Sequence, residues 1–224
     1  MRYLSADEHD KVTSAVEAAE AHTSGEIVTV LTDRSDGYSD IALAWSAAAA
    51  FTAMAVWSLF PDFYFGLIDR LLGGWNHSWT PALVLTTITA VAILKFLGMW
   101  LLQLWRPLKF ALVPGPVKTA RVRERAIDLF KVGADRRTQG RTGVLLYVSL
   151  HEHRAEIVAD QSISEKVAPE VWGEAMFDML EHIARGRVGD GLVAGIRDVG
   201  AVLAEHFPRV ENDINELPDR LVEI

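Results

Sequence analysis

The sequence contains no cysteine, which excludes disulfide bonds, thiolate zinc sites and cysteine nucleophiles. It also lacks a P-loop, a G-x-S-x-G nucleophile motif and an H-E-x-x-H zinc motif, so no motif identifies a catalytic nucleophile. The first residues, MRYLSADEHDK, lack the apolar core of a signal peptide. Any chemistry must therefore come from side chains that the fold brings together.

Charged side chains are nearly absent from two long stretches. Residues 41–60 contain none, and residues 80–105 contain only Lys95. A helix of about 20 apolar residues matches the hydrocarbon core of a bilayer. The sequence therefore predicts a transmembrane helical hairpin at residues 41–105, with spans at about 41–60 and 80–102. The alternative is a pair of core helices in a globular protein, but two such long runs are hard to bury in so small a domain.

The basic residues are distributed unevenly, and this predicts an orientation. Residues 103–141 hold ten basic residues and three acids, whereas residues 142–224 hold sixteen acids and seven basic residues. The turn between the spans, residues 61–79, has only Arg70. Because Lys and Arg beside a span stay on the cytoplasmic side, we expect a multi-pass membrane protein with both termini cytoplasmic. Nucleic acid is not an expected partner, since the rest of the soluble part is acidic.

Lys95 is the one charged residue within the predicted spans, and its insertion into a bilayer is unfavourable. An ammonium group near the centre of a bilayer costs about 2.5–3.5 kcal/mol on insertion scales. Its long side chain can snorkel to the cytoplasmic headgroups, which is the interpretation that we favour. A functional charge within the membrane is the alternative.

The soluble segments alternate between helical and strand patterns. Ser5 and Glu8 have the S-x-x-E spacing of a capping box, and a second S-x-x-E occurs at residues 162–165. Apolar residues at helical spacing or in continuous β-branched runs predict the remaining elements. The predicted helices are 117–132, 170–184 and 190–207, and the predicted strands are 26–32, 143–150 and 154–159.

The order of these elements predicts one interrupted domain. Strand 26–32 is too short and apolar to stand alone, so it needs the strands within 143–159 as partners. An even number of membrane crossings permits this pairing, with the first two strands parallel. The predicted fold class is α/β, a small mixed sheet flanked by helices and interrupted by the hairpin. Residues 1–36 and 117–207 form the two parts of the domain, and residues 208–224 form a loose acidic tail.

Three segments resemble a known family. They are SGEIVTVLT, RTGVLLYVSLHEHRAEIVADQSISEKV and GRVGDGLVAGIRDVGAVL. They resemble the TPM domain of bacterial membrane proteins and of thylakoid proteins linked to photosystem II maintenance. The resemblance covers residues 5–33 and 117–207 and implies a small sheet flanked by helices. It also implies two activities reported for some members, acid phosphatase activity and binding of a divalent cation through acidic residues. The glycine-rich segment of the family corresponds here to residues 160–165, which contain no glycine.

The edge of the sheet away from the membrane collects acidic residues that could bind a cation. Asp160, Glu165 and Glu26 could together hold Ca²⁺ or Mg²⁺. Solvated acids and a helix cap by Glu165 are the alternative, and we favour it. His151 and His153 have H-x-H spacing without an identifiable third ligand, which favours a hydrated turn.

A basic loop precedes the second strand. Arg136, Arg137 and Arg141 could bind phosphate groups in bidentate fashion. Contact with lipid headgroups or with an acidic partner is the alternative, and we favour it.

Two functions remain for the chain as a whole. The first is a non-enzymatic, membrane-anchored binding or assembly module, whose partners are the lipid bilayer and a protein in the membrane or at its cytoplasmic face. The second is a divalent-metal-assisted phosphatase with its site on the sheet edge away from the membrane. We favour the module, because similarity of fold does not supply a catalytic site.

Overall fold

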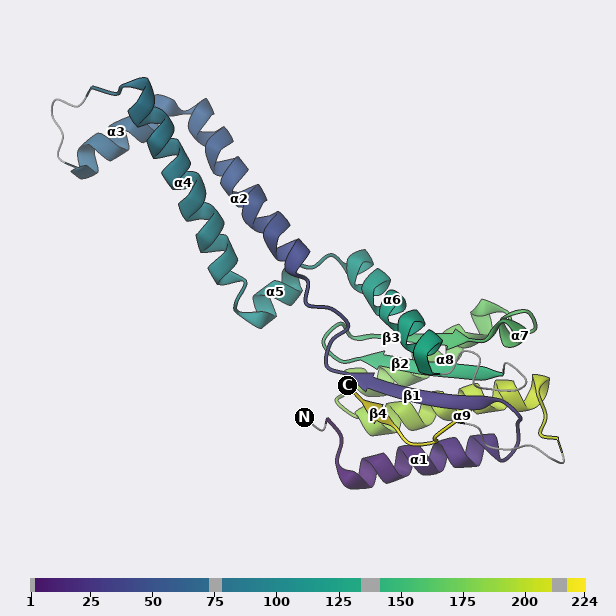
Figure 1. The fold of residues 1–224 in the computed structure, drawn as a ribbon. Helices are drawn as coiled ribbons and strands as arrows, with labels where there is room; N and C mark the ends of the chain where they lie inside the picture. Colours follow the sequence, from purple (N-terminus) through teal and green to yellow (C-terminus); the bar gives the residue numbers. More distant parts are fainter. Residues whose placement is uncertain (1–2, 73–77, 134–141, 211–216) are drawn as a thin grey trace. The chain divides into compact units, whose positions relative to one another are not determined.

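The computed structural model describes residues 3–72, 78–133, 142–210 and 217–224. The contacts within the chain divide it into two compact units. The first consists of Met1–Asp36 and Gly115–Ile224, and the second of Gly37–Pro114. Figure 1 shows the labelled elements of both units.

The first unit is built on a mixed sheet. Its strand order in the described residues is β3 (Arg154–Ala159), β2 (Gly143–Ser149), β1 (Glu26–Thr32) and β4 (Val222–Glu223). β1 pairs in parallel with β2, although the second unit lies between them in sequence. β3 returns antiparallel to β2. The predicted α/β fold with a small mixed sheet and the parallel pairing of its first two strands are thus confirmed.

Both faces of the sheet are buried, which explains the continuous apolar runs of the two inner strands. Successive side chains of a strand point to opposite faces. On β2, Val144, Leu146 and Val148 join one apolar core, and Leu145 and Tyr147 join the other.

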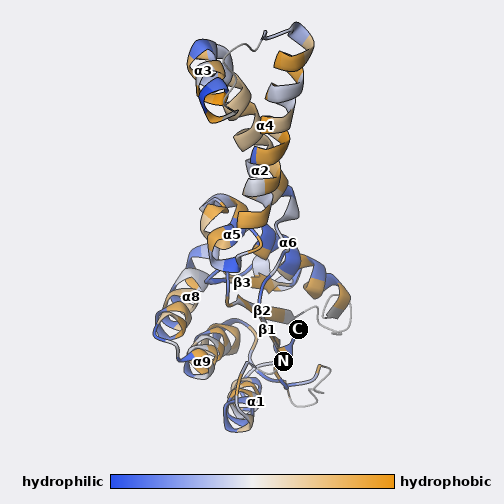
Figure 2. Cartoon of the chain, turned by 90° about the vertical axis from the view of Figure 1, so that its left-hand side faces the viewer, coloured by the Kyte–Doolittle hydropathy of each residue, from blue (hydrophilic) through white to orange (hydrophobic). Residues whose placement is uncertain are grey.

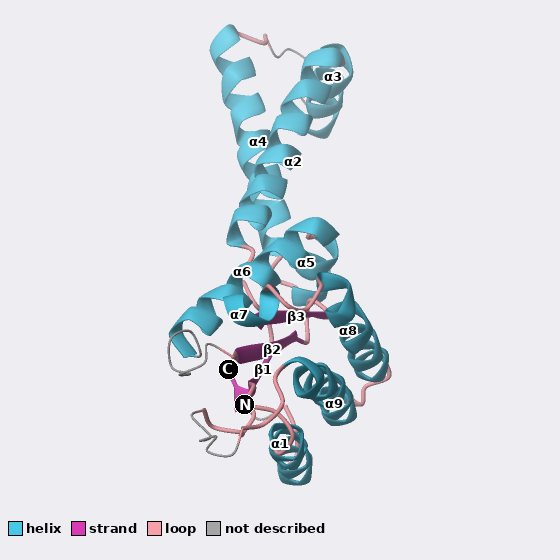
Figure 3. Ribbon diagram, turned by 90° about the vertical axis from the view of Figure 1, so that its right-hand side faces the viewer, coloured by secondary structure: helices cyan, strands magenta, loops and turns pink. Residues whose placement is uncertain are grey.

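α1 (Ala6–Glu20), α8 (Pro169–Ala184) and α9 (Val188–His206) cover one face of the sheet, and α6 (Gly115–Gly133) covers the other (Figure 3). The first core takes residues from α1, α8 and α9 and Ile163 of the short helix α7 (Gln161–Ser164), and the second takes residues from α6. Ser5 caps α1 and forms the predicted capping box with Glu8.

The second unit contains α2 (Ser39–Leu59) and α4 (Pro81–Leu102), which pack against each other. The side-chain amide of Gln103 joins them, donating to the carbonyl oxygens of Ala42 at 3.0 Å and Met99 at 3.1 Å. Both helices are long and apolar enough to cross a membrane, and they are coloured mostly orange in Figure 2. Large apolar side chains lie exposed along them, among them Phe51, Leu85 and Leu94, each about two-thirds exposed.

Two connections in the second unit are more helical than predicted. α3 (Pro61–Leu72) lies within residues 61–79, where a turn between the spans was predicted, and α5 (Arg106–Leu112) follows the second predicted span, where no helix was predicted. In both helices a proline occupies the first turn, where its missing N–H costs no hydrogen bond. Proline therefore starts these helices.

Two predictions for the first unit were wrong. Residues 162–165 form no capping box, because α7 begins at Gln161 with Asp160 in the capping position, two residues before Ser162, and Glu165 follows its last residue. The tail is not wholly loose either. β4 (Val222–Glu223) pairs with β1 in parallel, and the Glu223 carboxylate accepts hydrogen bonds from the backbone N–H groups of Tyr3 and Leu4.

Candidate functional site

The predicted acidic residues lie at the end of the sheet where β1 and β2 begin and β3 ends. Asp160 directly follows β3, is buried, and its carboxylate accepts a hydrogen bond from the Gly143 N–H at 3.0 Å. The Asp160 N–H donates in turn to the Gly143 carbonyl oxygen at 2.9 Å. Asp160 therefore completes the pairing of β2 with β3.

Glu26 lies at the same end of the sheet. It is in register with Gly143, is buried, and accepts a hydrogen bond from the Leu217 N–H at 3.2 Å. Glu165 is exposed and accepts from the Gln161 side chain at 2.8 Å.

These acids do not make a preformed cation site. Within residues 3–72, 78–133, 142–210 and 217–224, no group of three or more His, Asp or Glu side chains is placed to hold a metal ion. Moreover, the carboxylates of Asp160 and Glu26 are already committed to backbone N–H groups. The fit to Ca²⁺ or Mg²⁺ is poor, and the metal assignment stays a prediction.

The structure adds an acid that the sequence analysis missed. Glu20, in the last turn of α1, lines a small pocket of about 110 Å³ together with Glu26 and Asp219. Burial, helped by the negative charges of Glu26 and Asp219, raises the pKa of Glu20 to about 8, although the hydrogen bond from the Ile27 N–H acts in the opposite direction. Glu20 is consequently protonated for the most part at neutral pH. No local sequence pattern links these acids, because they come from α1, β1 and the tail.

His151 and the arginines of the basic loop complete the predicted residues. His151 lies 2.6 Å from a carboxylate oxygen of Asp33, so it joins the turn after β2 to the segment after β1. Its neighbour His153 adopts a left-handed backbone conformation and is exposed. Arg136, Arg137 and Arg141 lie outside the described residues.

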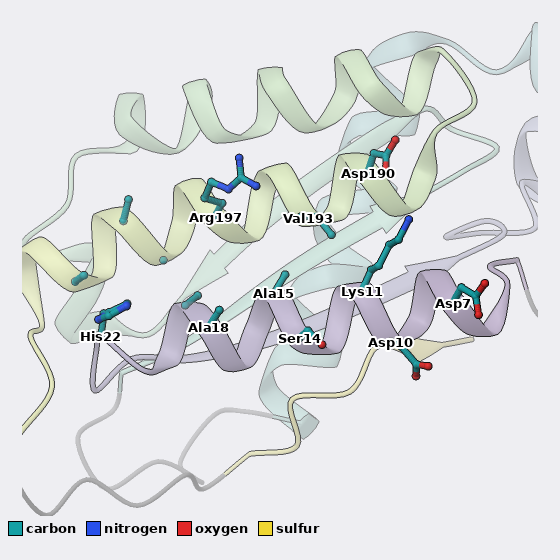
Figure 4. A pocket seen from close by; sticks show the side chains of 14 residues that line it. Asp7, Asp10, Lys11, Ser14, Ala15, Ala18, His22, Asp190, Val193 and Arg197 are labelled. Carbon is teal, nitrogen blue, oxygen red and sulfur yellow. The ribbon is translucent and has the colours of Figure 1, made fainter.

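A larger hollow of the first unit lies elsewhere, between α1 and α9 (Figure 4). It is a groove of about 780 Å³. Its wall consists largely of small side chains, namely Ala15, Ala18 and Ala19 of α1 and Gly200, Ala201 and Ala204 of α9. This composition reflects how the two helices pack. A Cβ atom added at Gly200 would lie only 2.6 Å from the Cβ atom of Ala19, so the helices approach too closely for a larger residue.

Charged residues border this α1–α9 groove unevenly. Asp7 and Asp10 lie near the start of α1, and Asp190 near the start of α9. Arg197 lies two turns further along α9, and His22 follows the end of α1 (Figure 4). One end of the groove therefore carries these three carboxylates and the ammonium group of Lys11, and the other end carries basic side chains.

Comparison with known proteins gives the family of the first unit. Residues 113–202 match the family model of the TPM domain. The chain contains a TPM domain. The match spans α6 to most of α9, and hence β2 and β3, which carried the resemblance in sequence.

The fold agrees with one solved structure. The BA42 protein of the psychrophilic bacterium Bizionia argentinensis superposes with a TM-score of 0.57 and 20% sequence identity, covering 100% of this chain and 97% of that one. At this identity the likeness concerns the fold alone. No curated protein sequence matches the chain. The comparisons thus identify the family and the fold of this TPM domain, and they do not identify its function.

Proposed function

We propose that this chain is a membrane-anchored TPM-domain protein that binds a partner protein, without catalysis, through the α1–α9 groove at the cytoplasmic face of the bacterial inner membrane. The observation that supports the binding role is the groove itself, which has a wall of small residues and two ends that differ in charge. The acids of the sheet end, in contrast, are occupied by backbone hydrogen bonds.

The shape of the groove suits a helix. Small side chains let a third helix approach two packed helices closely. In helix-in-groove binding, the contacting residues recur about one helical turn apart. Positions 193, 197, 200, 201 and 204 of α9 have that spacing. The partner helix would carry small or apolar residues on its inner face, a basic end over Asp7, Asp10 and Asp190, and an acidic end near Arg197.

Membrane anchoring is supported by the second unit. α2 and α4 are long enough to span a bilayer, and their apolar residues are largely exposed, unlike those of core helices in a soluble protein. The basic residues after α4, beginning with Arg106 and Lys109, support retention of that side in the cytoplasm. Both termini are then cytoplasmic, and these basic residues can contact anionic lipids.

The groove is tested with a photo-reactive amino acid placed at Ala18 in the full-length chain, expressed in native membranes. The same probe at Phe177, an exposed residue of α8 outside the groove, serves as the control. We expect a discrete protein adduct from position 18 only, and its loss when Ala201→Arg fills the groove. Equal labelling from both positions, or labelling unaffected by Ala201→Arg, would refute the proposal.

The divalent-metal-assisted phosphatase is the second candidate. It draws on the proximity of Glu20, Glu26 and Asp219 at the sheet end. The discriminating assay is hydrolysis of a chromogenic phosphomonoester by the full-length chain in detergent, with and without Mg²⁺ or Ca²⁺. Metal-dependent turnover that Glu26→Gln abolishes would favour the enzyme, and absence of turnover alongside groove labelling would favour the module.

A further inference from the structure

A second groove lies within the second unit, between α2 and α4. Its volume is about 530 Å³. α2 contributes one face of small residues, Ala48, Ala49, Thr52 and Ala53, continued by Trp45, Val56 and Trp57. α4 contributes Val91, Lys95 and Met99. Small residues on one helix face let another helix approach closely within a membrane.

Two hydrogen-bond donors of this α2–α4 groove have no acceptor. In the part of the chain that the structure describes, Lys95 makes no hydrogen bond or ion pair. The indole N–H of Trp57 is likewise without an acceptor among the described residues, although the side chain is only 4% exposed. Lys95 is exposed, carries a positive charge and can only donate hydrogen bonds, so a helix that pairs with it in this groove must supply an acceptor with negative charge.

The position of Lys95 disfavours a lipid headgroup as its counter-ion. Lys95 lies seven residues before Leu102, the last residue of α4, which corresponds to about 10 Å along the helix axis. Side chains of a helix lean toward its N-terminus. The Lys95 side chain therefore leans toward the middle of the span and away from the nearer interface.

We propose that the α2–α4 groove binds a transmembrane helix of a different membrane protein, one that carries an aspartate or glutamate near the middle of its span. This inference rests on the membrane anchoring proposed above and is independent of the α1–α9 groove. A second copy of the chain cannot supply the carboxylate at that depth. In the two spanning helices the only acid is Asp40, in the first turn of α2.

The test measures association of the full-length chain with designed helices in phosphatidylcholine vesicles. The chain has no cysteine, so Leu59→Cys gives a unique site for a fluorescent donor. The acceptor-labelled probes are leucine–alanine helices of about 20 residues carrying Glu or Gln at the centre. We expect the Glu helix to bind about tenfold more tightly than the Gln helix, and Lys95→Met to remove this difference.

Two matched substitutions test the groove separately from the charge. Ala48 and Ala55 are both exposed alanines of α2, and only Ala48 lines the groove. Ala48→Leu should weaken binding of both probe helices, whereas Ala55→Leu should leave it unchanged.

Three results would overturn the inference. The first is equal binding of the Glu and Gln helices. The second is association of two copies of the chain, measured by energy transfer between them, that displaces the Glu helix. The third is Lys95-dependent energy transfer to the probe helix that arises only when phosphatidylglycerol is added. Flotation of the chain with the vesicles is measured first. A chain that does not float refutes the membrane anchoring, whereas a floating chain without preference for the Glu helix refutes only the inference.

Discussion

Replacing Glu20 with glutamine should alter how the stability of the TPM domain depends on pH. Burial raises the pKa of Glu20 from its ordinary value of 4.5 to about 8 in the folded protein. The folded state thus holds this proton more tightly than the unfolded state does. The stabilising effect is fully present below pH 4.5, declines as the pH rises through the interval to about 8, and is absent above it. Glutamine cannot ionise, and its side-chain oxygen can still accept from the Ile27 N–H.

The size of the effect follows from the two pKa values. Each pKa unit of difference corresponds to about 1.4 kcal/mol, so ionising Glu20 at pH 9 costs at most about 4–5 kcal/mol. Because the carboxyl is only half-buried, solvent screens part of this cost. We therefore expect Glu20→Gln to be about 2 kcal/mol more stable than the wild type at pH 9, and nearly equal to it at pH 4.5.

The measurement is urea denaturation of the full-length chain in non-ionic detergent micelles, followed by far-ultraviolet circular dichroism at several pH values. Burial also raises the pKa values of Glu156 and Asp198, but these acids are present in both proteins and cancel in the difference. Glu17→Gln is the matched control, since Glu17 lies on the same helix, lines the same pocket and is exposed. If wild type and Glu20→Gln lose stability in parallel from pH 5 to 9, the reasoning about Glu20 is refuted.

Three further predictions concern packing, and the same urea denaturation at neutral pH measures them. Gly200→Ala should destabilise the first unit by about 1–3 kcal/mol because the added Cβ atom meets Ala19, whereas Gly173→Ala in α8, with open space around it, should stabilise it by up to about 1 kcal/mol. Asp160→Ala should cost about 1–3 kcal/mol because it leaves the buried Gly143 N–H without its acceptor, whereas Glu165→Ala should change stability by less than about 0.5 kcal/mol. Leu221→Ala should cost about 2–4 kcal/mol if the tail is part of the core, and a negligible change would show that it is not.

Sequence reasoning succeeded where the physical signal was local or strictly topological. The apolar runs of β1 and β2 indicated burial on both faces, and the even number of predicted membrane crossings allowed the two strands to pair. The capping box of Ser5 needed only four adjacent residues. The same spacing misled at residues 162–165, because Asp160 takes the capping position there and the backbone of α7 starts earlier.

The remaining errors arise from contacts between distant residues. β4 has two residues, too few to show a strand period, and the Glu223 carboxylate and the buried Leu221 hold it in place. The raised pKa of Glu20 depends first on its burial and then on Glu26 and Asp219, and only the folded chain provides these surroundings. The α1–α9 groove escaped notice because alanine and glycine give no apolar stripe large enough to mark a surface.

The separation of β1 from β2 has a consequence for how ribosomes make this protein. More than a hundred residues lie between Thr32 and Gly143, so at about 5–20 residues per second the first strand waits for about 5–20 s before its neighbour is synthesised. Throughout that delay an apolar, β-branched segment is exposed beside a translating ribosome, where it could pair with other nascent chains. Prompt capture of the following helix by the membrane insertion machinery would keep that segment tethered and apart from its copies.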